Sequence, residues 1–198
     1  MDQTLRRKWD DRHRARSDMS IPSRVLTENA HLLPASGRAL DLACGLGSDA
    51  LYLAVRGLEV WAWDISSVAI QRLRQRASRR GLCIAARVRD VLAQPPSAGS
   101  VDVIIVSHFL DRTLTPALLA ALRPEGLICY QTFTQRTPQA APRGPQGPDR
   151  RLAENELLAM FVPPLRLRVY REENLCGDRS LGWRGMAMLV AQKMPEAS

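Results

Sequence analysis

The sequence predicts an α/β fold: a seven-stranded, mostly parallel sheet that ends in an antiparallel hairpin, with helices on both faces. Strand and helix signals alternate from residue 38 to residue 133, as expected for βαβ units. Two further apolar strands near the C-terminus are joined by a tight connection, which favours antiparallel pairing. A chain of 198 residues is the usual size of one such domain.

Local signals define the elements of the parallel part. The nearly uninterrupted β-branched run over residues 101–106 is typical of a buried central strand. Ser66 is a preferred N-cap residue, and Gly81 is a preferred residue just after a helix end. Prolines and a glycine over residues 95–99 predict a surface loop. In chain order we expect a strand over 38–42, a helix over 48–56, a strand over 59–63, a helix over 66–80, strands over 83–89 and 101–106, a helix over 116–122 and a strand over 127–133.

The two ends of the chain differ from this regular pattern. Proline and glycine are frequent over residues 135–149, which predicts a loop or lid. A helix over 154–161 and strands over 165–172 and 185–192 follow. At the other end, Leu5 and Trp9 form one apolar stripe on an otherwise charged helix. That helix either packs on the domain or closes over a ligand, and we divide the chain into a helical lid, 1–36, and a main domain, 37–198.

Polar residues cluster where the first two strands end. Asp41 closes the first strand, Gly45 and Gly47 form the turn that follows it, and Asp64 comes directly after the second strand. A glycine turn lets backbone approach a ligand closely, and the helix behind it presents unpaired N–H groups. A carboxylate about 20 residues after the glycines is placed to accept hydrogen bonds from ribose hydroxyls. The pattern predicts a nucleoside site.

Asp41 indicates which nucleoside this site takes. Residues 45–50 also satisfy the dinucleotide pattern G-x-G-x-x-G/A. A pyrophosphate would lie over that turn, however, and a carboxylate four residues before the first glycine would repel it. The same carboxylate suits a ligand with a cationic amino group, and the amino acid end of S-adenosylmethionine is such a group.

A family resemblance points the same way. Residues 41–47, Asp-Leu-Ala-Cys-Gly-Leu-Gly, together with Asp64-Ile65-Ser66, resemble the donor-binding signature of class I methyltransferases. Residues 9–13, Trp-Asp-Asp-Arg-His, resemble the W-D-x-R-Y element of the tellurite-resistance group, which overlaps the thiopurine methyltransferases. The likeness extends to Pro22-Ser23, to residues 37–45 and 51–54, to Gly57, and to residues 131–134 and 156–158. One departure is Ser48-Asp49, where the group often has Arg-Asn.

The resemblance implies a Rossmann-like class I methyltransferase fold and an S-adenosylmethionine-dependent enzyme that releases S-adenosylhomocysteine. It also implies where the parts of the methyl donor lie. Gly45, Gly47 and Ser107 would meet the methionine part, whose amino group suits Asp41. Arg12 would lie near the donor's carboxylate, and Trp9 is a further candidate donor-binding residue. Asp64 and Ile65 would hold the ribose and adenine, while Asp90 and Val91 would meet the adenine edge.

The acceptor side is expected at the end of the fourth strand. Residues 107–111 read Ser-His-Phe-Leu-Asp, without the Asn/Asp-Pro-Pro-Tyr/Phe motif of enzymes that methylate exocyclic amino groups of bases. His108 is a candidate general base, because ligands of α/β sheets bind at the carboxyl ends of strands. It is equally a candidate structural histidine that touches the donor through its backbone. Candidate substrate-binding residues are Tyr130 on the fifth strand and Arg143, Arg150 and Arg151, which either draw in an anion or serve as solubilising charges.

Composition narrows the function classes. The net charge of +8 comes mainly from arginine, but the basic stripes lack the interleaved aromatic residues used in nucleic-acid recognition, so binding to nucleic acid is disfavoured. The four cysteines are widely spaced and predict neither a metal site nor a disulfide framework. With no signal peptide and no apolar run of ~20 residues, we expect a cytoplasmic protein, monomeric or homodimeric, with no membrane partner.

The leading hypothesis is a methyltransferase for a small soft nucleophile, namely a thiol, a thiopurine or a chalcogen oxyanion. The alternatives are an RNA or protein methyltransferase, and a protein that binds S-adenosylmethionine without turnover.

Overall fold

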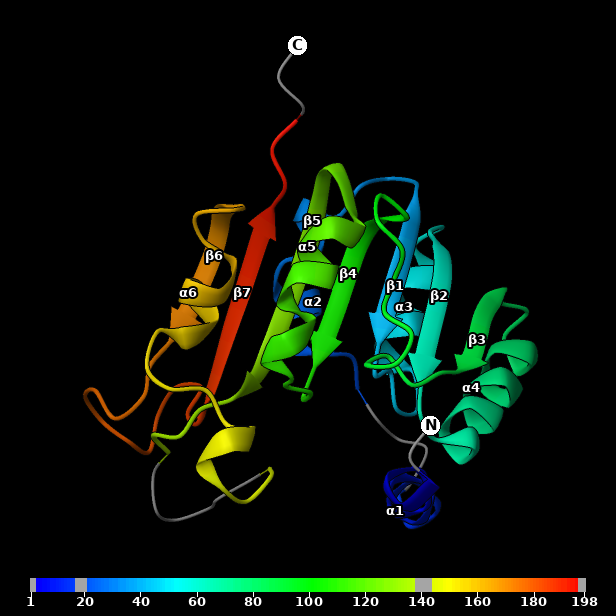
Figure 1. The fold of residues 1–198 in the computed structure, drawn as a ribbon, viewed down its shortest axis with the longest axis horizontal. Helices are drawn as coiled ribbons and strands as arrows, with labels where there is room; N and C mark the ends of the chain where they lie inside the picture. Colours follow the sequence, from blue (N-terminus) through cyan, green and yellow to red (C-terminus); the bar gives the residue numbers. More distant parts are fainter. Residues whose placement is uncertain (1–2, 17–20, 138–143, 196–198) are drawn as a thin grey trace.

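The computed structural model describes residues 3–16, 21–137 and 144–195. One seven-stranded sheet runs through it in the order β3-β2-β1-β4-β5-β7-β6 (Figure 1). The first five strands of that order pair in parallel, whereas β7 is antiparallel to both β5 and β6. The predicted fold class is confirmed. The strands are β1 Arg38–Leu42, β2 Glu59–Asp64, β3 Ile84–Val88, β4 Val101–Ser107, β5 Leu122–Phe133, β6 Arg166–Glu172 and β7 Met186–Gln192.

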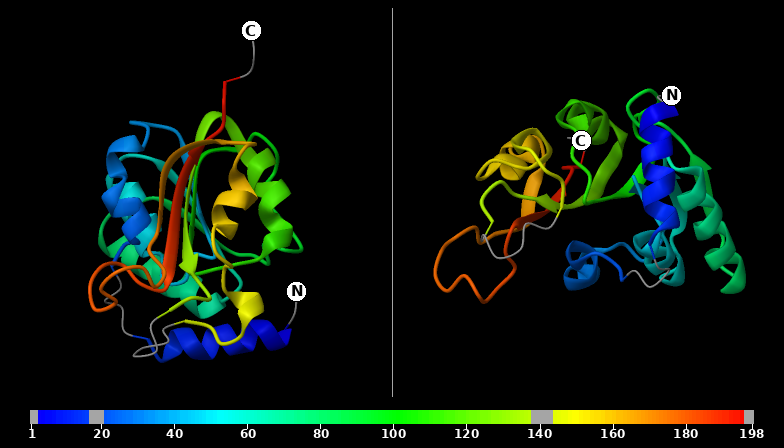
Figure 2. Two further views of the ribbon diagram at one scale, coloured as in Figure 1. Left: turned by 90° about the vertical axis from the view of Figure 1, so that its left-hand side faces the viewer. Right: turned by 90° about the horizontal axis from the view of Figure 1, so that it is seen from below.

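Helices cover both faces of this sheet (Figure 2). One face carries α5 and α6, and the other carries α2, α3 and α4. A further helix, α1, lies across the lower edge of the sheet in Figure 1, where the parallel strands end. The α-helices are α1 Gln3–Arg14, α2 Arg24–Glu28, α3 Ser48–Val55, α4 Ser67–Arg79, α5 Thr115–Ala121 and α6 Glu156–Phe161, and short 3-10 turns cover Ala30–Leu32, Arg112–Leu114 and Pro148–Arg150.

The core consists of two apolar layers, one on each face of the sheet. In β4, Ile104 and Val106 belong to the layer under α5 and α6, while Val103 and Ile105 belong to the opposite layer. All four are completely buried. This two-sided burial is what the β-branched run of β4 predicts, because a central parallel strand needs an apolar side chain at every position.

The fifth strand starts earlier than the sequence predicts. Residues 123–126, which have turn composition, were expected to separate a helix from a strand at 127. Instead Leu122 already pairs with Val101, and Leu127 pairs with Val103. The extra residues bulge out, with Glu125 in the left-handed region (φ 63°). A local turn signal does not reveal that the strand pairing continues on both sides of it.

The segment expected to form the lid is divided in the structure. Only α1 lies over the strand ends, whereas α2 packs against β5 and β7. Val25 and Leu26 of α2 are completely buried and belong to the core layer on that face. Residues 24–28 are thus part of the main domain's packing.

Two observations concern membrane association and redox state. Within the described ranges, no helix has the length and apolar character needed to cross a membrane. Cys44, Cys83, Cys129 and Cys176 are all free thiols.

Candidate active site

The glycine turn between β1 and α3 is held by the carboxylate of Asp41. Its Oδ2 accepts a hydrogen bond from the backbone N–H of Ala50 in the first turn of α3 (2.9 Å). The turn itself uses left-handed backbone at Gly45 (φ 51°) and Gly47 (φ 73°), which glycine adopts at little cost. Asp41 therefore fixes the start of α3 directly beside the turn.

Asp64 connects the end of β2 to the same turn. Its Oδ2 accepts from the N–H of Gly45 and its Oδ1 from the N–H of Ser66, both at 2.8 Å. Each carboxylate oxygen has two lone pairs, so both can accept a second hydrogen bond. Asp64 is thus positioned beside the turn, with Ile65 directly after it, as the sequence predicts.

A third carboxylate, noted in the sequence only as a departure from the family pattern, completes this acidic cluster. Asp49 Oδ1 accepts from the N–H of Ser23 (2.6 Å). Burial raises the pKa values of Asp41, Asp49 and Asp64, and the like charge of Asp49 raises that of Asp41 further. Desolvated carboxylates of this kind favour a ligand that brings positive charge.

The two glycines of the turn face different neighbours. A Cβ on Gly45 would lie 3.2 Å from Cε1 of His13, whereas a Cβ on Gly47 would lie 2.4 Å from Cδ1 of Leu73. The expectation that Gly45 and Gly47 approach the donor stays a prediction, and the Cβ direction of Gly47 is occupied by a leucine of α4. Gly47 permits α3 and α4 to pack closely.

Helix α1 turns a different set of residues inward than expected. Asp10 and His13 are its buried residues. Asp10 accepts hydrogen bonds from Ser66 Oγ (2.6 Å) and from the N–H of Val68 (3.2 Å). Burial alone would raise the pKa of Asp10, but these hydrogen bonds and nearby Arg6 outweigh it and lower that pKa.

Trp9 and Arg12 contact other residues of α1. Trp9 stacks on His13, with 5.9 Å between ring centroids, and the exposed Arg12 guanidinium lies 5.1 Å from the centre of the Trp9 ring. Their predicted roles in donor binding stay predictions. His13, buried against the glycine turn, is the residue of this segment that the sequence analysis undervalued.

The third strand supplies the remaining residues on the donor side. Asp90 Oδ1 accepts from the N–H groups of Leu92 and Ala93, at 3.2 and 3.3 Å, and so caps the turn after β3. Val91 is buried in the core layer under α5 and α6. The proposed contact of Asp90 and Val91 with adenine stays a prediction.

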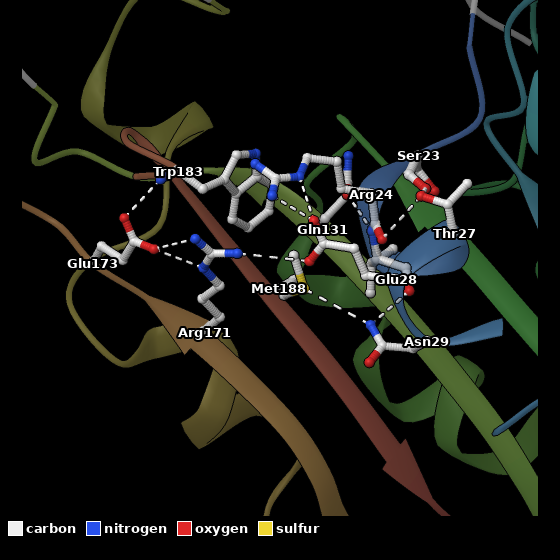
Figure 3. Close-up of polar contacts among 11 residues, drawn as sticks. Ser23, Arg24, Thr27, Glu28, Asn29, Gln131, Arg171, Glu173, Trp183 and Met188 are labelled. Carbon is white, nitrogen blue, oxygen red and sulfur yellow. Dashed lines mark hydrogen bonds and ion pairs between the residues drawn. The ribbon is translucent and has the colours of Figure 1, made fainter. Parts of the chain in front are cut away.

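At the end of β4, Ser107 and His108 belong to a hydrogen-bonded chain. Ser107 Oγ lies 2.8 Å from Nδ1 of His108 and accepts from Nε2 of Gln131 (3.3 Å). Gln131 Oε1 in turn accepts from the N–H of Val25 on α2 (2.8 Å), and Figure 3 shows Gln131 beside that helix. Gln131 lies opposite Ser107 in the sheet, so the pairing brings both side chains to one face.

The environment of His108 favours its neutral form. The residue is exposed and has left-handed backbone (φ 59°), a strained conformation that is common at functional sites. Its ring packs against Phe133 at 5.2 Å between centroids. Desolvation by the surrounding protein lowers the pKa of His108, and the charge of Arg16 lowers it further.

The structure corrects two predictions on the acceptor side. Tyr130 is 1% exposed, its hydroxyl donates to the carbonyl of Phe109 (2.9 Å), and its ring packs on Phe161, so it is a core residue. Arg151 is buried and donates to the carbonyls of Pro145 and Thr134, both at 2.9 Å, so it holds its own loop together. Arg150 is exposed, as a residue that attracts anions needs to be, whereas Arg143 lies outside the described residues.

Comparison with known proteins agrees with this geometry. The profile of a methyltransferase-domain family matches residues 39–126, which span the glycine turn and the ends of β2 and β4. A probable S-adenosyl-L-methionine-dependent methyltransferase, TehB of Haemophilus influenzae, is 27% identical over 88 residues, which are 43% of this chain and 31% of TehB. The crystal structure of Haemophilus influenzae TehB superposes with a TM-score of 0.73 at 21% identity, covering 93% of this chain and 67% of that one. The fold of the chain is that of class I methyltransferases.

The chain is also similar to a protein-L-isoaspartate O-methyltransferase of Methylorubrum extorquens. The two are 34% identical over 91 residues, which are 46% of this chain and 40% of the relative. The chain thus spans less than half the length of both curated relatives. Their names refer to different enzymes, so the acceptor has to be inferred from the site itself.

The cofactor of class I methyltransferases is S-adenosylmethionine, and the residues present fit it. The molecule carries a cationic ammonium group and a sulfonium sulfur, and the desolvated carboxylates of Asp41, Asp49 and Asp64 favour positive charge. Asp64 retains acceptor capacity for ribose hydroxyls beside Gly45. Both observations match the donor that the sequence predicts.

Proposed function

We propose that this protein is an S-adenosylmethionine-dependent methyltransferase that acts on a small soft nucleophile: a thiol, a thiopurine or a chalcogen oxyanion. S-adenosylmethionine supplies a methyl group that is already activated by its sulfonium sulfur. The protein must therefore hold donor and acceptor in line and keep water out, and it needs little acid–base machinery.

The position of His108 carries the proposal. In the sheet, Val106 pairs with Leu42, the residue after Asp41. His108, two residues further along, consequently lies at the strand end next to the donor site. It is exposed there, and the surrounding protein lowers its pKa by desolvation, which favours the neutral imidazole. A neutral imidazole beside the donor suits a small polar acceptor, and we assign His108 to acceptor contact.

The loop after β5 supports a small acceptor. Arg112 donates to the backbone carbonyls of Asp149 (2.7 Å) and Arg151 (3.1 Å) and pairs with Glu156. These contacts fix residues 149–151 against the segment that follows β4, and this part of the loop lies beyond the end of β5 (Figure 1). A loop fixed in this way restricts the size of what reaches His108, and exposed Arg150 on it favours anions.

The arginines of α4 argue against an RNA acceptor. Arg72 donates to the carbonyl of Arg16 (2.8 Å), Arg74 to that of Ala86 (2.6 Å) and Arg76 to that of Leu46 (2.7 Å). Side chains bound to carbonyl groups of the fold have fewer N–H donors left for phosphates. The basic helix is therefore mainly a structural element.

A methyl-transfer assay with labelled donor tests the proposal. The acceptors are tellurite, selenite, small thiols, thiopurines and total tRNA, and Asp64→Ala serves as the control that lacks the ribose carboxylate. We expect incorporation into one or more small acceptors and loss of that incorporation in the control. Incorporation confined to tRNA would support the RNA methyltransferase alternative, and donor binding without any incorporation would support the non-catalytic one.

A further inference from the structure

The chain of hydrogen bonds from α2 to His108 has a direction. It begins at the backbone N–H of Val25, which can only donate, so the atom of Gln131 that faces it must be the carbonyl oxygen Oε1. The other end of the same amide, Nε2, then faces Ser107 and donates to its hydroxyl oxygen. The two contacts together settle the orientation of the Gln131 amide, which one contact alone would leave open.

This direction continues through Ser107. Its Oγ accepts from Gln131, and its own hydroxyl hydrogen needs an acceptor. Among the described side chains, the acceptor within hydrogen-bonding distance of Ser107 Oγ is Nδ1 of His108, at 2.8 Å. A hydroxyl that accepts one hydrogen bond is also a better donor in the next, which favours a chain running one way.

The start of the chain is firmly anchored. Figure 3 shows α2 joined to the β6–β7 region through Glu28, whose carboxylate pairs with Arg24 and, at 3.6 Å, with Arg171. The Trp183 ring lies 5.4 Å from the Arg24 guanidinium and 6.0 Å from that of Arg171. Gln131 itself is 3% exposed. The Val25 N–H therefore has a defined position relative to the sheet.

We propose that Gln131 and Ser107 are positioning residues that hold the proton of neutral His108 on Nε2. Nδ1 accepts from Ser107, and the Nε2–H group, which has no hydrogen-bond partner among the described residues, points to the acceptor as a hydrogen-bond donor. This inference rests on the proposed function for the statement that an acceptor binds there. It replaces the general-base role considered for His108.

The inferred proton position selects the chemical class of the acceptor. When an anion such as a thiolate is methylated, its lone pair forms the bond to the methyl carbon, and the electron pair of the broken bond stays on the donor's sulfur. The product carries one negative charge fewer than the acceptor did, and no proton is released. A neutral thiol would release a proton, and Nε2, which already carries one, has no lone pair to take it. The site is therefore built for an acceptor that arrives ionised.

The test is the tautomer of His108, read from long-range ¹H–¹⁵N correlations of the ¹⁵N-labelled full chain at neutral pH, with and without S-adenosylhomocysteine. His108→Gln assigns the signals among the three histidines. We expect His108 to be protonated on Nε2. In Gln131→Glu, one carboxylate oxygen still accepts from Val25, but the other now accepts from the Ser107 hydroxyl. Ser107 then accepts from Nδ1–H, and the proton of His108 moves to Nδ1.

Two further variants complete the design. Gln75→Glu adds the same charge on the exposed side of α4 and should leave the tautomer unchanged. Ser107→Ala removes the link and should produce a mixture of tautomers, which keeps the test informative if Gln131→Glu does not fold. Protonation on Nδ1 in the wild type, or an unchanged single tautomer in Ser107→Ala, would overturn the inference. Failure to bind S-adenosylhomocysteine would instead count against the proposed function, because the tautomer is also read without ligand.

Discussion

The carboxylate of Asp10 on α1 accepts a hydrogen bond from the hydroxyl of Ser66 (2.6 Å), and Ser66 is also the N-cap residue of α4. Two residues before Ser66 stands Asp64, whose Oδ1 accepts from the Ser66 N–H. One short segment therefore holds both the docking point of α1 and the carboxylate that we propose binds the donor's ribose. Docking of α1 and order at the donor site are linked through this segment.

Replacing Asp10 by Ala should release α1 from the strand ends. Each hydrogen bond to a charged group contributes about 1.5–3 kcal/mol to stability. Loss of these bonds should markedly reduce the protection of the α1 amides against hydrogen exchange. Asp11→Ala is the matched control, because Asp11 is exposed and pairs with Arg14 on the same helix. Equal protection in both variants would show that Asp10 does not dock α1.

Asp41→Asn should raise the stability of the protein and at the same time weaken donor binding. The asparagine oxygen still accepts from Ala50, while a buried charge beside Asp49 is removed, so the melting temperature of the unliganded protein should rise at neutral pH. Affinity for S-adenosylmethionine should fall about tenfold, or ~1.4 kcal/mol. Affinity for 5′-methylthioadenosine, which lacks the amino acid, should fall less. Equal losses for the two ligands in calorimetry would make Asp41 purely structural.

Donor binding should depend on pH through the acidic cluster. Burial raises the folded-state pKa values of Asp41, Asp49 and Asp64, so the folded protein holds these protons more tightly than the unfolded chain does. The free energy of unfolding should therefore fall as pH rises from the ordinary aspartate pKa through the raised folded-state pKa values. A cationic ligand needs the ionised carboxylates, so affinity for S-adenosylmethionine should weaken as pH falls through that same range. Calorimetric titrations at several pH values that gave constant affinity would contradict this.

Gly47→Ala should destabilise the protein more than Gly57→Ala. Both glycines have left-handed backbone, which costs about 1–2 kcal/mol for other residues. A Cβ at Gly57 meets nothing within 4 Å, whereas one at Gly47 meets Leu73 at 2.4 Å. Overpacking adds about 1–3 kcal/mol. Chemical denaturation measures the difference, and equal losses would mean that Leu73 moves aside freely.

Local patterns in the sequence were sufficient for the presence and order of the strands, though not for the start of β5, and for the positions of the glycine turn, Asp41 and Asp64, since each is specified by neighbours a few residues away. Contacts between distant residues were not accessible. Gln131 meets Val25, which is 106 positions away, and nothing near either residue signals that contact. The alternation of side chains along a strand indicates that Tyr130 and Gln131 face opposite sides of the sheet. It does not indicate which of the two faces α2, because that depends on where the helix packs.

The N-terminal helix and the proline-rich loop show the same limit. Arg12 and His13 are adjacent, and a helix turns them to different sides, so the tertiary contact with Gly45 decides which one is buried. Arg150 and Arg151 are likewise adjacent, but one is exposed and the other is buried among carbonyl groups.

Equilibrium dialysis of labelled S-adenosylmethionine against the full chain tests the central claim most directly. We predict saturable binding of one molecule per chain, competition by S-adenosylhomocysteine and none by NAD⁺. Asp64→Ala should weaken binding by about 1–3 kcal/mol, because hydrogen bonds to a charged group are lost. Asp178→Ala, on the exposed loop before β7, should bind like the wild type. Absence of binding, displacement by NAD⁺, or unchanged affinity in Asp64→Ala would contradict the assignment.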